Sequence, residues 1–214
     1  MARITVIGGT GYAGSLIVAE AAARGHQVTS ISRSVPAEQV DGVTYVAGSL
    51  LDADTRARAV ADADVVYSAI SPRGDMAGQT RQGLADLAAA AQDAGVRLGI
   101  TGGAGSLLVA EGGPQLFTTP EFPEAFQAEA LEMGEVLDDL RASDEALDWF
   151  FVSPAAGFGA FAPGEKTGAY RVGGDVLLAD AEGNSFISGA DFATAIVDEI
   201  EKPAHRRARF TVAY

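Results

Sequence analysis

The sequence predicts an α/β fold, in which a single domain is built around a doubly wound parallel sheet. Three observations lead to this prediction. Short β-branched runs alternate with longer alanine-rich helical patterns along most of the chain, as in parallel sheets that are covered by helices on both faces. The first such run passes into a helical pattern through closely spaced glycines. The length of 214 residues suits one domain, residues 1–214, and leaves little room for another.

The elements of the amino-terminal half follow from apolar periodicity and its interruptions. Residues 3–7 form a short apolar run typical of a buried strand, and residues 12–24 repeat apolar side chains at helical spacing until Gly25. The long alanine-rich stretch 76–94 has the same spacing and stops before Gly95. Further strands are expected at 27–31, 43–46 and 64–70, and a short helix at 54–61.

In the carboxyl-terminal half, glycine and proline separate the regular elements. A glycine- and proline-rich loop occupies 102–122, Pro123 suits the first turn of the next helix, and Pro154 ends a strand. From 155 to 187 the pattern changes to short strands and turns, which we interpret as a small substrate-side β insertion over the carboxyl edge of the sheet. Strands are expected at 97–101, 147–152, 168–172, 176–179, 185–187 and 208–213, and helices at 123–142 and 190–201.

The composition excludes several classes of function. The net charge of −14, from 15 basic and 29 acidic residues, gives a surface that repels nucleic acid and anionic membranes. There is no cysteine, and no spacing of His, Asp and Glu is typical of a metal site, so neither a disulfide nor a metal is expected. The apolar runs fall far short of the ~20 residues of a transmembrane helix. We therefore expect a cytoplasmic protein, monomeric or homodimeric, that acts on a small molecule.

The glycine spacing Gly8-x-x-Gly11-x-x-Gly14 carries the most functional information. It follows a strand pattern and opens a helix, which is the arrangement that binds dinucleotides. One glycine makes the tight turn, one lets backbone amides approach a pyrophosphate, and one lets helix and strand pack closely, while the helix dipole favours the phosphate charge. The alternative is a tight turn without a ligand. The contacts expected here are Gly8, Thr10, Gly11, Tyr12 and Ala13.

The tip of the second strand indicates which dinucleotide binds. NAD-binding proteins carry an acidic residue there that binds the ribose hydroxyls, but this chain has none between Glu20 and Glu38. Arg33, followed by Ser34, instead offers a planar charged donor to a 2′-phosphate. NADP(H) is therefore favoured over NAD(H), unless Arg33 is simply a solvated surface residue.

Other coenzyme contacts are expected where strands end. Leu51 and Asp52 follow the third strand and suit the adenine ring, although Asp52 would equally cap the next helix. The residues that follow the fourth, fifth and sixth strands should run along the rest of the coenzyme. These are Ala69, Ile70, Ser71, Thr101, Gly102, Pro154 and Ala155.

Several motifs together resemble a known family. The motifs that carry the resemblance are Gly8-Gly9-Thr10-Gly11-x-x-Gly14, Arg33 after the second strand, Thr101-Gly102-Gly103-Ala104-Gly105-Ser106, Ser153-Pro154-Ala155, Thr167-Gly168-x-Tyr170-Arg171-x-Gly173-Gly174, Ile187-Ser188-x-x-Asp191 and Phe210-Thr211-Val212. In these motifs the chain resembles, over nearly its whole length, the atypical short-chain dehydrogenase/reductases, in particular NAD(P)H-binding candidate NADH-flavin reductases, and more distantly biliverdin reductase B. The resemblance implies a Rossmann-like fold and hydride transfer from a nicotinamide to a flavin or a related acceptor.

The Tyr-x-x-x-Lys pair that is usual in this family is absent. The only lysines are Lys166 and Lys202, and neither follows a tyrosine at this spacing. Where the pair would be expected, the chain reads Ala125-Phe126-Gln127-Ala128-Glu129. Alcohol oxidation by such a pair is therefore disfavoured, whereas flavin reduction mainly needs an acceptor stacked at the correct distance.

The candidates for the reaction itself are few. Thr101, at the tip of the fifth strand, should lie nearest the nicotinamide, and Ser106 could orient the acceptor; each could equally be a structural residue of a strand or loop. Phenylalanines in the loops over the sheet suit the walls of a pocket for a flat acceptor, unless they form a small core of their own. They are Phe117, Phe122, Phe126 and Phe158, with Phe161 close by in sequence.

The sequence thus favours an NADPH-dependent reductase of a small flat acceptor such as a flavin or a quinone, with the flavin as a substrate rather than a bound prosthetic group. One alternative is a regulator that senses NADP(H) without turning it over, which the missing Tyr–Lys pair would suit. Another is a reductase or isomerase of a specific aromatic metabolite.

Overall fold

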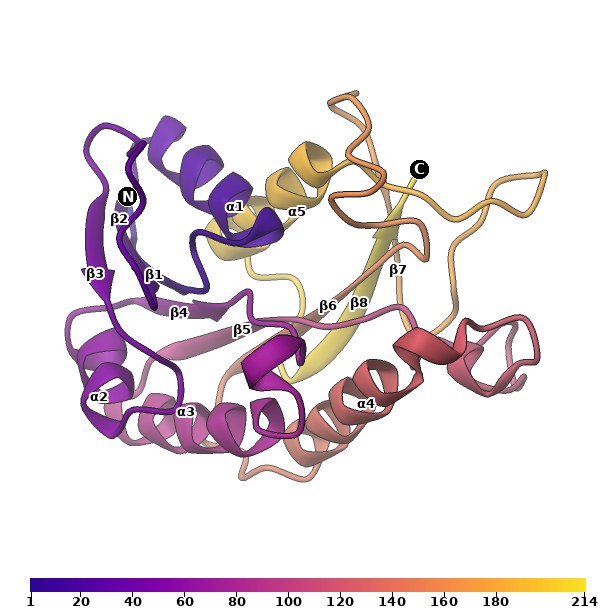
Figure 1. Ribbon diagram of the computed structural model, residues 1–214, viewed down its shortest axis with the longest axis horizontal. Coiled ribbons are helices and arrows are strands. Elements are labelled where there is room, and N and C mark those ends of the chain that lie inside the picture. The colour runs from indigo at the N-terminus through magenta and orange to yellow at the C-terminus, as the bar shows by residue number, and fades with distance from the viewer.

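The computed structural model describes residues 1–214 and places eight strands in a single sheet (Figure 1). The strand order is β3-β2-β1-β4-β5-β6-β8-β7, and all neighbouring pairs are parallel except β7 with β8. The doubly wound α/β fold predicted from the sequence is confirmed. The strands are β1 (Arg3–Ile7), β2 (Gln27–Ser32), β3 (Thr44–Ala47), β4 (Val65–Ser68), β5 (Arg97–Thr101), β6 (Trp149–Pro154), β7 (Arg171–Gly173) and β8 (Ala208–Ala213).

Helices cover both faces of this sheet. Figure 1 shows α1 and α5 on one face and α2, α3 and α4 on the other. Each layer encloses its own apolar core, because successive side chains of a strand point to opposite faces; on β6, Phe150 packs in the first core and Phe151 in the second. No helix combines the length and the apolar character that crossing a bilayer requires. The helices are α1 (Tyr12–Ala23), α2 (Ala53–Ala61), α3 (Thr80–Ala94), α4 (Gln127–Arg141) and α5 (Gly189–Glu201).

The strand order reverses beside β1, and this reversal positions the site. The chain continues from β1 outward to β2 and β3, then returns to place β4 on the other side of β1. The loops that leave β1 and β4 therefore diverge, which opens a crevice at the carboxyl edge of the sheet.

Two helices begin later than the sequence predicts. α3 begins at Thr80 rather than at residue 76. A 3-10 turn over Gly74–Met76 comes first, and Gly78, with a φ of 73°, then interrupts the chain before the helix starts. α4 begins at Gln127 rather than at residue 123, because the chain first makes a 3-10 turn over Glu124–Phe126. A third such turn spans Leu116–Thr118.

Of the three strands predicted between residues 168 and 187, two do not form. Only β7 forms there, at the edge of the sheet, where it pairs antiparallel with β8. The stretches 176–179 and 185–187 make single bridges, from Val176 to Leu108 and from Phe186 to Gly157, and no ladder. A strand needs a neighbour with free backbone groups along its length, and β7 already occupies the edge beside β8.

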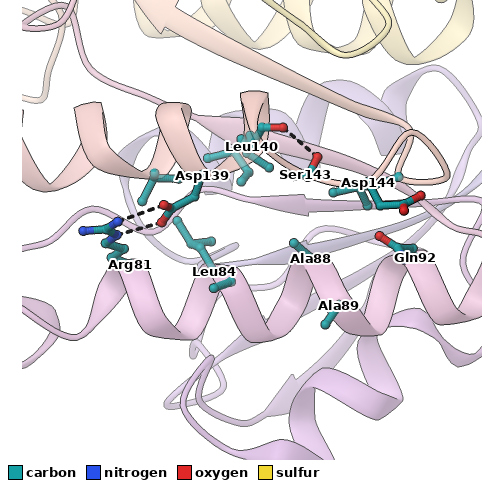
Figure 2. Close-up of a pocket in the computed structure, with 13 residues that line it drawn as sticks. Arg81, Leu84, Ala88, Ala89, Gln92, Asp139, Leu140, Ser143 and Asp144 are labelled. Carbon is teal, nitrogen blue, oxygen red and sulfur yellow. Dashed lines mark hydrogen bonds and ion pairs between the residues drawn. The ribbon is translucent and has the colours of Figure 1, made fainter.

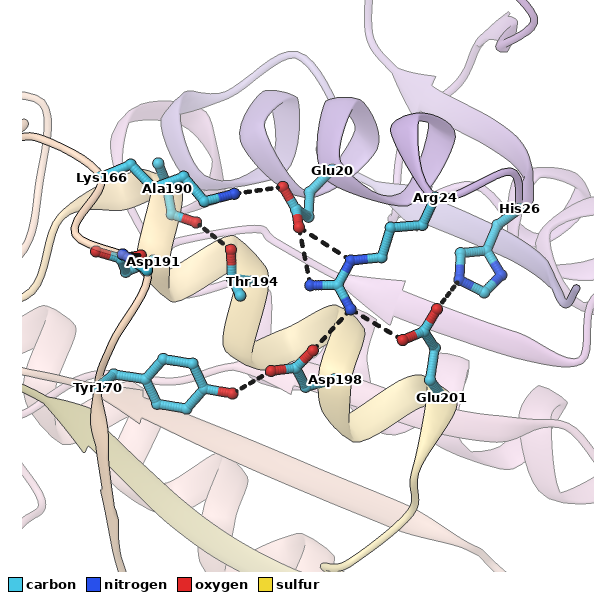
Figure 3. A network of polar contacts seen from close by, with 11 residues as sticks. Glu20, Arg24, His26, Lys166, Tyr170, Ala190, Asp191, Thr194, Asp198 and Glu201 are labelled. Atoms are coloured by element: carbon cyan, nitrogen blue, oxygen red, sulfur yellow. Dashed lines mark hydrogen bonds and ion pairs between the residues drawn. The ribbon is translucent and has the colours of Figure 1, made fainter.

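A polar network joins α1 to α5 and to residues 155–187 (Figure 3). Arg24, at the end of α1, is ion-paired with Glu20 at 2.8 Å and with Asp198 of α5 at 2.6 Å. Lys166, from residues 155–187, reaches Glu20 at 2.9 Å. Ion pairs that water still reaches in part, as here, contribute little free energy individually, so the network mainly fixes how the three segments sit together.

Asp191, in the first turn of α5, holds the loop over residues 163–168 in place. Its carboxylate accepts hydrogen bonds from the Thr167 amide at 2.7 Å, the Gly168 amide at 3.0 Å and the Tyr214 hydroxyl at 2.6 Å. Asp191 is fully buried, and Ser188 Oγ caps the helix by accepting from its amide. Burial opposes ionisation, but the hydrogen bonds from Tyr214, Thr167 and Gly168 outweigh it and lower the pKa of Asp191 to about 2.

Replacing Asp191 by asparagine is expected to lower the free energy of unfolding by about 2 kcal/mol at neutral pH, because each pKa unit corresponds to about 1.4 kcal/mol. The folded-state pKa lies below the ordinary value, so this contribution is present above about pH 4 and is lost as the pH falls towards the folded-state pKa. Urea unfolding across this pH range measures it: the difference between wild type and Asp191→Asn should shrink as the pH falls. Asp41→Asn, at an exposed loop position, is the control and should change little. A difference that stays constant with pH would contradict the assignment.

Candidate functional site

A cavity of about 320 Å³ opens at the carboxyl ends of β1, β4, β5 and β6. Its walls come from the loops that follow these strands and from the beginning of α4. Doubly wound sheets bind ligands at this edge, because the loops on the two sides of the strand-order reversal diverge there. The lining residues are 11–13, 69–73, 101–105, 154–156 and 158–161, together with Phe122, Phe126, Glu129, Ala130 and Met133.

The three glycines of the Gly8-x-x-Gly11-x-x-Gly14 spacing differ in what a side chain at each position would meet. Gly8 has a φ of 82°, which side chains rarely tolerate, and so makes the tight turn. A Cβ on Gly14 would lie 2.1 Å from the Gly8 carbonyl oxygen, so α1 can pack against the turn only with glycine there. A Cβ on Gly11 would meet only that same oxygen, at 3.4 Å. Gly11 therefore presents open backbone to the cavity, whose wall it forms.

The amino terminus of α1 faces this cavity without a side-chain cap. Tyr12 and Ala13 are its first residues and line the cavity, and no side chain accepts a hydrogen bond from the first amides of the helix. The first N–H groups of a helix have no partner within it, and the helix dipole adds a partial positive charge. This end of α1 can therefore hold the negative charge of a pyrophosphate.

Most residues predicted from the strand ends surround this one cavity. They belong to loops that are far apart in the sequence, and the fold brings them together. Phe161 is 71% exposed where the cavity meets solvent. The predicted residues that line the cavity are Gly11, Tyr12, Ala13, Ala69, Ile70, Ser71, Thr101, Gly102, Pro154 and Ala155, with the aromatic residues Phe122, Phe126 and Phe158.

The residues predicted to hold the adenosine end lie outside the cavity wall, where β2 ends. Arg33 directly follows β2, and its guanidinium is ion-paired with Asp75 at 2.8 Å, with both side chains largely exposed. Ser34 is exposed beside it. An exposed pair of this kind contributes little free energy, so the Arg33 guanidinium can exchange Asp75 for another anion.

Leu51 and Asp52, predicted to contact the adenine, also lie outside the cavity wall, and so do Gly8 and Thr10 of the glycine-rich turn. Leu51 is exposed, and Asp52 occupies the N-cap position of α2 although its carboxylate makes no hydrogen bond to the helix. Gly8 lies in the turn beneath the cavity wall. Thr10 is exposed, and its amide donates to Ser32 Oγ at 3.1 Å.

Two of the predicted residues, Ser106 and Phe117, do not line the cavity. Ser106 is buried and its hydroxyl accepts from the Arg209 guanidinium at 3.0 Å, while the same guanidinium binds Asp175. Phe117 packs behind the loop, where its Cβ would lie 3.4 Å from a Cβ added to Gly105. Of the two hydroxyl groups predicted for the reaction, those of Thr101 and Ser106, a ligand in the cavity could reach only that of Thr101.

The sequence reasoning missed a charged pair in the cavity wall. Arg73 Nε lies 2.5 Å from Glu129 Oε2, and the Arg73 guanidinium lies 5.4 Å from the centre of the Phe126 ring. Arg73 and Glu129 are the only charged residues that line the cavity. Helical spacing from Phe126 could have found Ala130 and Met133, and the run after Thr101 could have found 103–105, but no pattern in the sequence pairs residue 73 with residue 129.

A second cavity, of about 260 Å³, lies between α3 and α4 (Figure 2). Arg81 and Asp139 form a bidentate ion pair at one end of it, with contacts of 2.7 and 2.8 Å. Leu84 and Ala88 contribute apolar walls from α3. None of the residues predicted for the site lines this cavity.

Comparison with known proteins gives consistent likenesses over the whole chain. A family described as NAD(P)H-binding matches residues 8–203. A candidate exported protein from Burkholderia pseudomallei is 43% identical, with a TM-score of 0.89 over 100% of both chains. A candidate epimerase from Bacteroides thetaiotaomicron is 34% identical, with a TM-score of 0.89 over 100% of this chain and 97% of the other. A candidate NADH-flavin reductase from Streptococcus pneumoniae is 34% identical, with a TM-score of 0.84 over 100% and 99%.

Proposed function

The chain belongs to the NAD(P)H-binding family, and we propose that it is an NADPH-dependent reductase of a small flat acceptor such as a flavin or a quinone. One observation carries the proposal. One cavity lies at the edge of the sheet where this fold binds coenzymes. It is lined by the uncapped amino terminus of α1, by the residues at the ends of β4, β5 and β6, and by several phenylalanine side chains.

The coenzyme would be held by residues of three kinds. The first amides of α1 would bind the pyrophosphate, and Arg33 would bind the 2′-phosphate in place of Asp75. Thr101, Pro154 and Ala155, at the ends of β5 and β6, would contact the nicotinamide. When bound, NADPH supplies a hydride to the acceptor, which takes its proton from water.

The walls of the cavity favour a planar acceptor that is uncharged where it is enclosed. Phe122, Phe126 and Phe158 offer ring faces and edges for stacking. Arg73 and Glu129 neutralise one another at 2.5 Å, so neither sign of charge is favoured inside. Hydride transfer to such an acceptor requires alignment of two rings and no tyrosine–lysine pair.

The two lysines do not replace the missing pair. Lys166 is ion-paired with Glu20 on the outer side of α1, and Lys202 ends α5. Neither lines the cavity. This absence is the specific observation that favours the second candidate function, a regulator that binds NADP(H) without consuming it.

An absorbance assay tests the proposal. Purified protein is mixed with NADPH and with FMN or a water-soluble quinone, and loss of the nicotinamide absorbance band is followed. We expect protein-dependent consumption that is faster with NADPH than with NADH. Tight NADPH binding without consumption across several flavins and quinones would contradict the reductase and favour the regulator. The cytoplasmic location and the oligomeric state stay predictions.

A further inference from the structure

A buried tyrosine hydroxyl lies directly behind Thr101. Tyr67, on β4, is fully buried, and its hydroxyl lies 2.7 Å from Thr101 Oγ1. Neither hydroxyl has another hydrogen-bond partner in the structure. Thr101 itself lines the cavity. The two groups therefore form a chain of two hydroxyls that leads from the core of the sheet to the ligand space.

The sheet geometry brings this pair together. Tyr67 lies opposite Gly99 in the register of β4 and β5, and Thr101 is two residues further along the same strand, so it points to the same face. A Cβ on Gly99 would lie 2.4 Å from Tyr67 Cδ2. Glycine at this position therefore gives the Tyr67 ring room to lie across β5 and reach Thr101.

The direction of the hydrogen bond follows from burial. Burial raises the pKa of Tyr67 well above its ordinary value, so its hydroxyl keeps its proton. If Thr101 donated, the Tyr67 proton would be left without an acceptor in an apolar core, which is costly. Tyr67 therefore donates to Thr101 Oγ1, and the proton of Thr101 is free to point into the cavity.

We propose that Tyr67 is a positioning residue, which turns the Thr101 hydroxyl into a hydrogen-bond donor for a carbonyl oxygen bound in the cavity. The inference rests on the proposed function and deepens it. The carbonyl has two sources that share this chemistry, the carboxamide of the nicotinamide and the ring carbonyl of a flavin or quinone acceptor. Without Tyr67, Thr101 could rotate and turn its proton elsewhere.

Removal of the single hydroxyl group by Tyr67→Phe tests this proposal. We expect a loss of about 5- to 10-fold, the size of one hydrogen bond. If the carbonyl belongs to the coenzyme, the loss appears in the Kd for NADPH, measured by nicotinamide fluorescence, and not in the Kd for 2′-phospho-ADP-ribose, which lacks nicotinamide. If it belongs to the acceptor, the loss appears in kcat/KM for the quinone with the Kd for NADPH unchanged.

Three further variants separate positioning from a general structural effect. Thr101→Val should cause a similar loss, and Tyr67→Phe added to it should cause little more, because both act through one hydroxyl. Thr101→Ser keeps the hydroxyl and should retain most of the wild-type values. Tyr45→Phe removes a hydroxyl that is bonded to the Val40 amide and should leave them unchanged.

Two results would overturn the proposal: wild-type values for Tyr67→Phe in both measurements, or losses that multiply in the double variant. If the wild type reduces no acceptor, the reductase proposal fails, and the Kd for NADPH alone then decides the role of Tyr67. A Kd raised by Tyr67→Phe would support it, and an unchanged Kd would overturn it.

Discussion

Gly14→Ala is expected to abolish NADPH binding, with an affinity loss of at least ~100-fold, and to destabilise the fold by about 1–3 kcal/mol. The added methyl carbon would lie 2.1 Å from the Gly8 carbonyl oxygen and 2.9 Å from the Gly9 Cα. Both are backbone atoms that cannot rotate away, so α1 must move from the turn. The amides at its amino terminus would then no longer point at a common phosphate position. Fluorescence titration with NADPH and urea unfolding measure the two effects.

Gly134→Ala is the matched control for this variant. Gly134 also lies within a helix, α4, but a Cβ there would meet its nearest neighbour, Ser106 Cβ, at an ordinary 3.7 Å. Alanine is the better helix former by about 1 kcal/mol, so Gly134→Ala should bind NADPH normally and unfold at a higher urea concentration. If Gly14→Ala does not fold, Gly11→Ala replaces it: a Cβ at Gly11 has room within the protein but enters the proposed phosphate position. Normal NADPH binding by a folded Gly11→Ala would argue against the assigned position.

Arg33→Asp should weaken NADPH binding by roughly 100- to 1000-fold and change NADH binding by less than about threefold. The substitution removes a charge-assisted bond worth about 1.5–3 kcal/mol. It also puts a like charge next to the 2′-phosphate, which adds about 1 kcal/mol at this largely exposed position, and each 1.4 kcal/mol is tenfold in affinity. NADH has no phosphate at this position, so the loss should be specific. Titration of both coenzymes measures the ratio.

Two further variants test whether this effect is specific to Arg33. Asp75→Asn removes the carboxylate that Arg33 binds at 2.8 Å and should strengthen NADPH binding a few-fold, since the phosphate no longer competes with it. Lys202→Asp makes the same change of net charge at the end of α5, on the opposite edge of the sheet, and should leave the coenzyme ratio unchanged. Equal weakening of NADPH and NADH by Arg33→Asp would remove Arg33 from the phosphate site.

The parts of the site that the sequence could predict are those governed by local rules. The spacing of Gly8 and Gly14 reports a turn that only glycine can make. Residues at the ends of parallel strands must meet at one edge, which places Thr101 and Pro154 near each other without further knowledge. The parallel sheet with helices on both faces follows from strand–helix alternation.

The parts that the sequence could not predict depend on contacts between distant segments. Ser106 follows the glycine run, but Gly105 sits against Ala130 of α4, where a Cβ would come within 2.5 Å, and the chain turns the Ser106 side chain towards Arg209. Likewise, the contact of Arg73 with Glu129 joins residues far apart in the chain. No local periodicity encodes either arrangement.

Gly99 on β5 packs closely against the Tyr67 ring on β4 and the Phe150 ring on β6, so the residues that fit at these three positions depend on one another. A Cβ at residue 99 would lie 2.4 Å from Tyr67 Cδ2 and also 2.4 Å from Phe150 Cζ, so a relative that carries a side chain there must accommodate both rings. Where the residue at position 67 becomes smaller, the hydroxyl behind Thr101 is lost. Positions 67, 99 and 150 should therefore vary together in evolution.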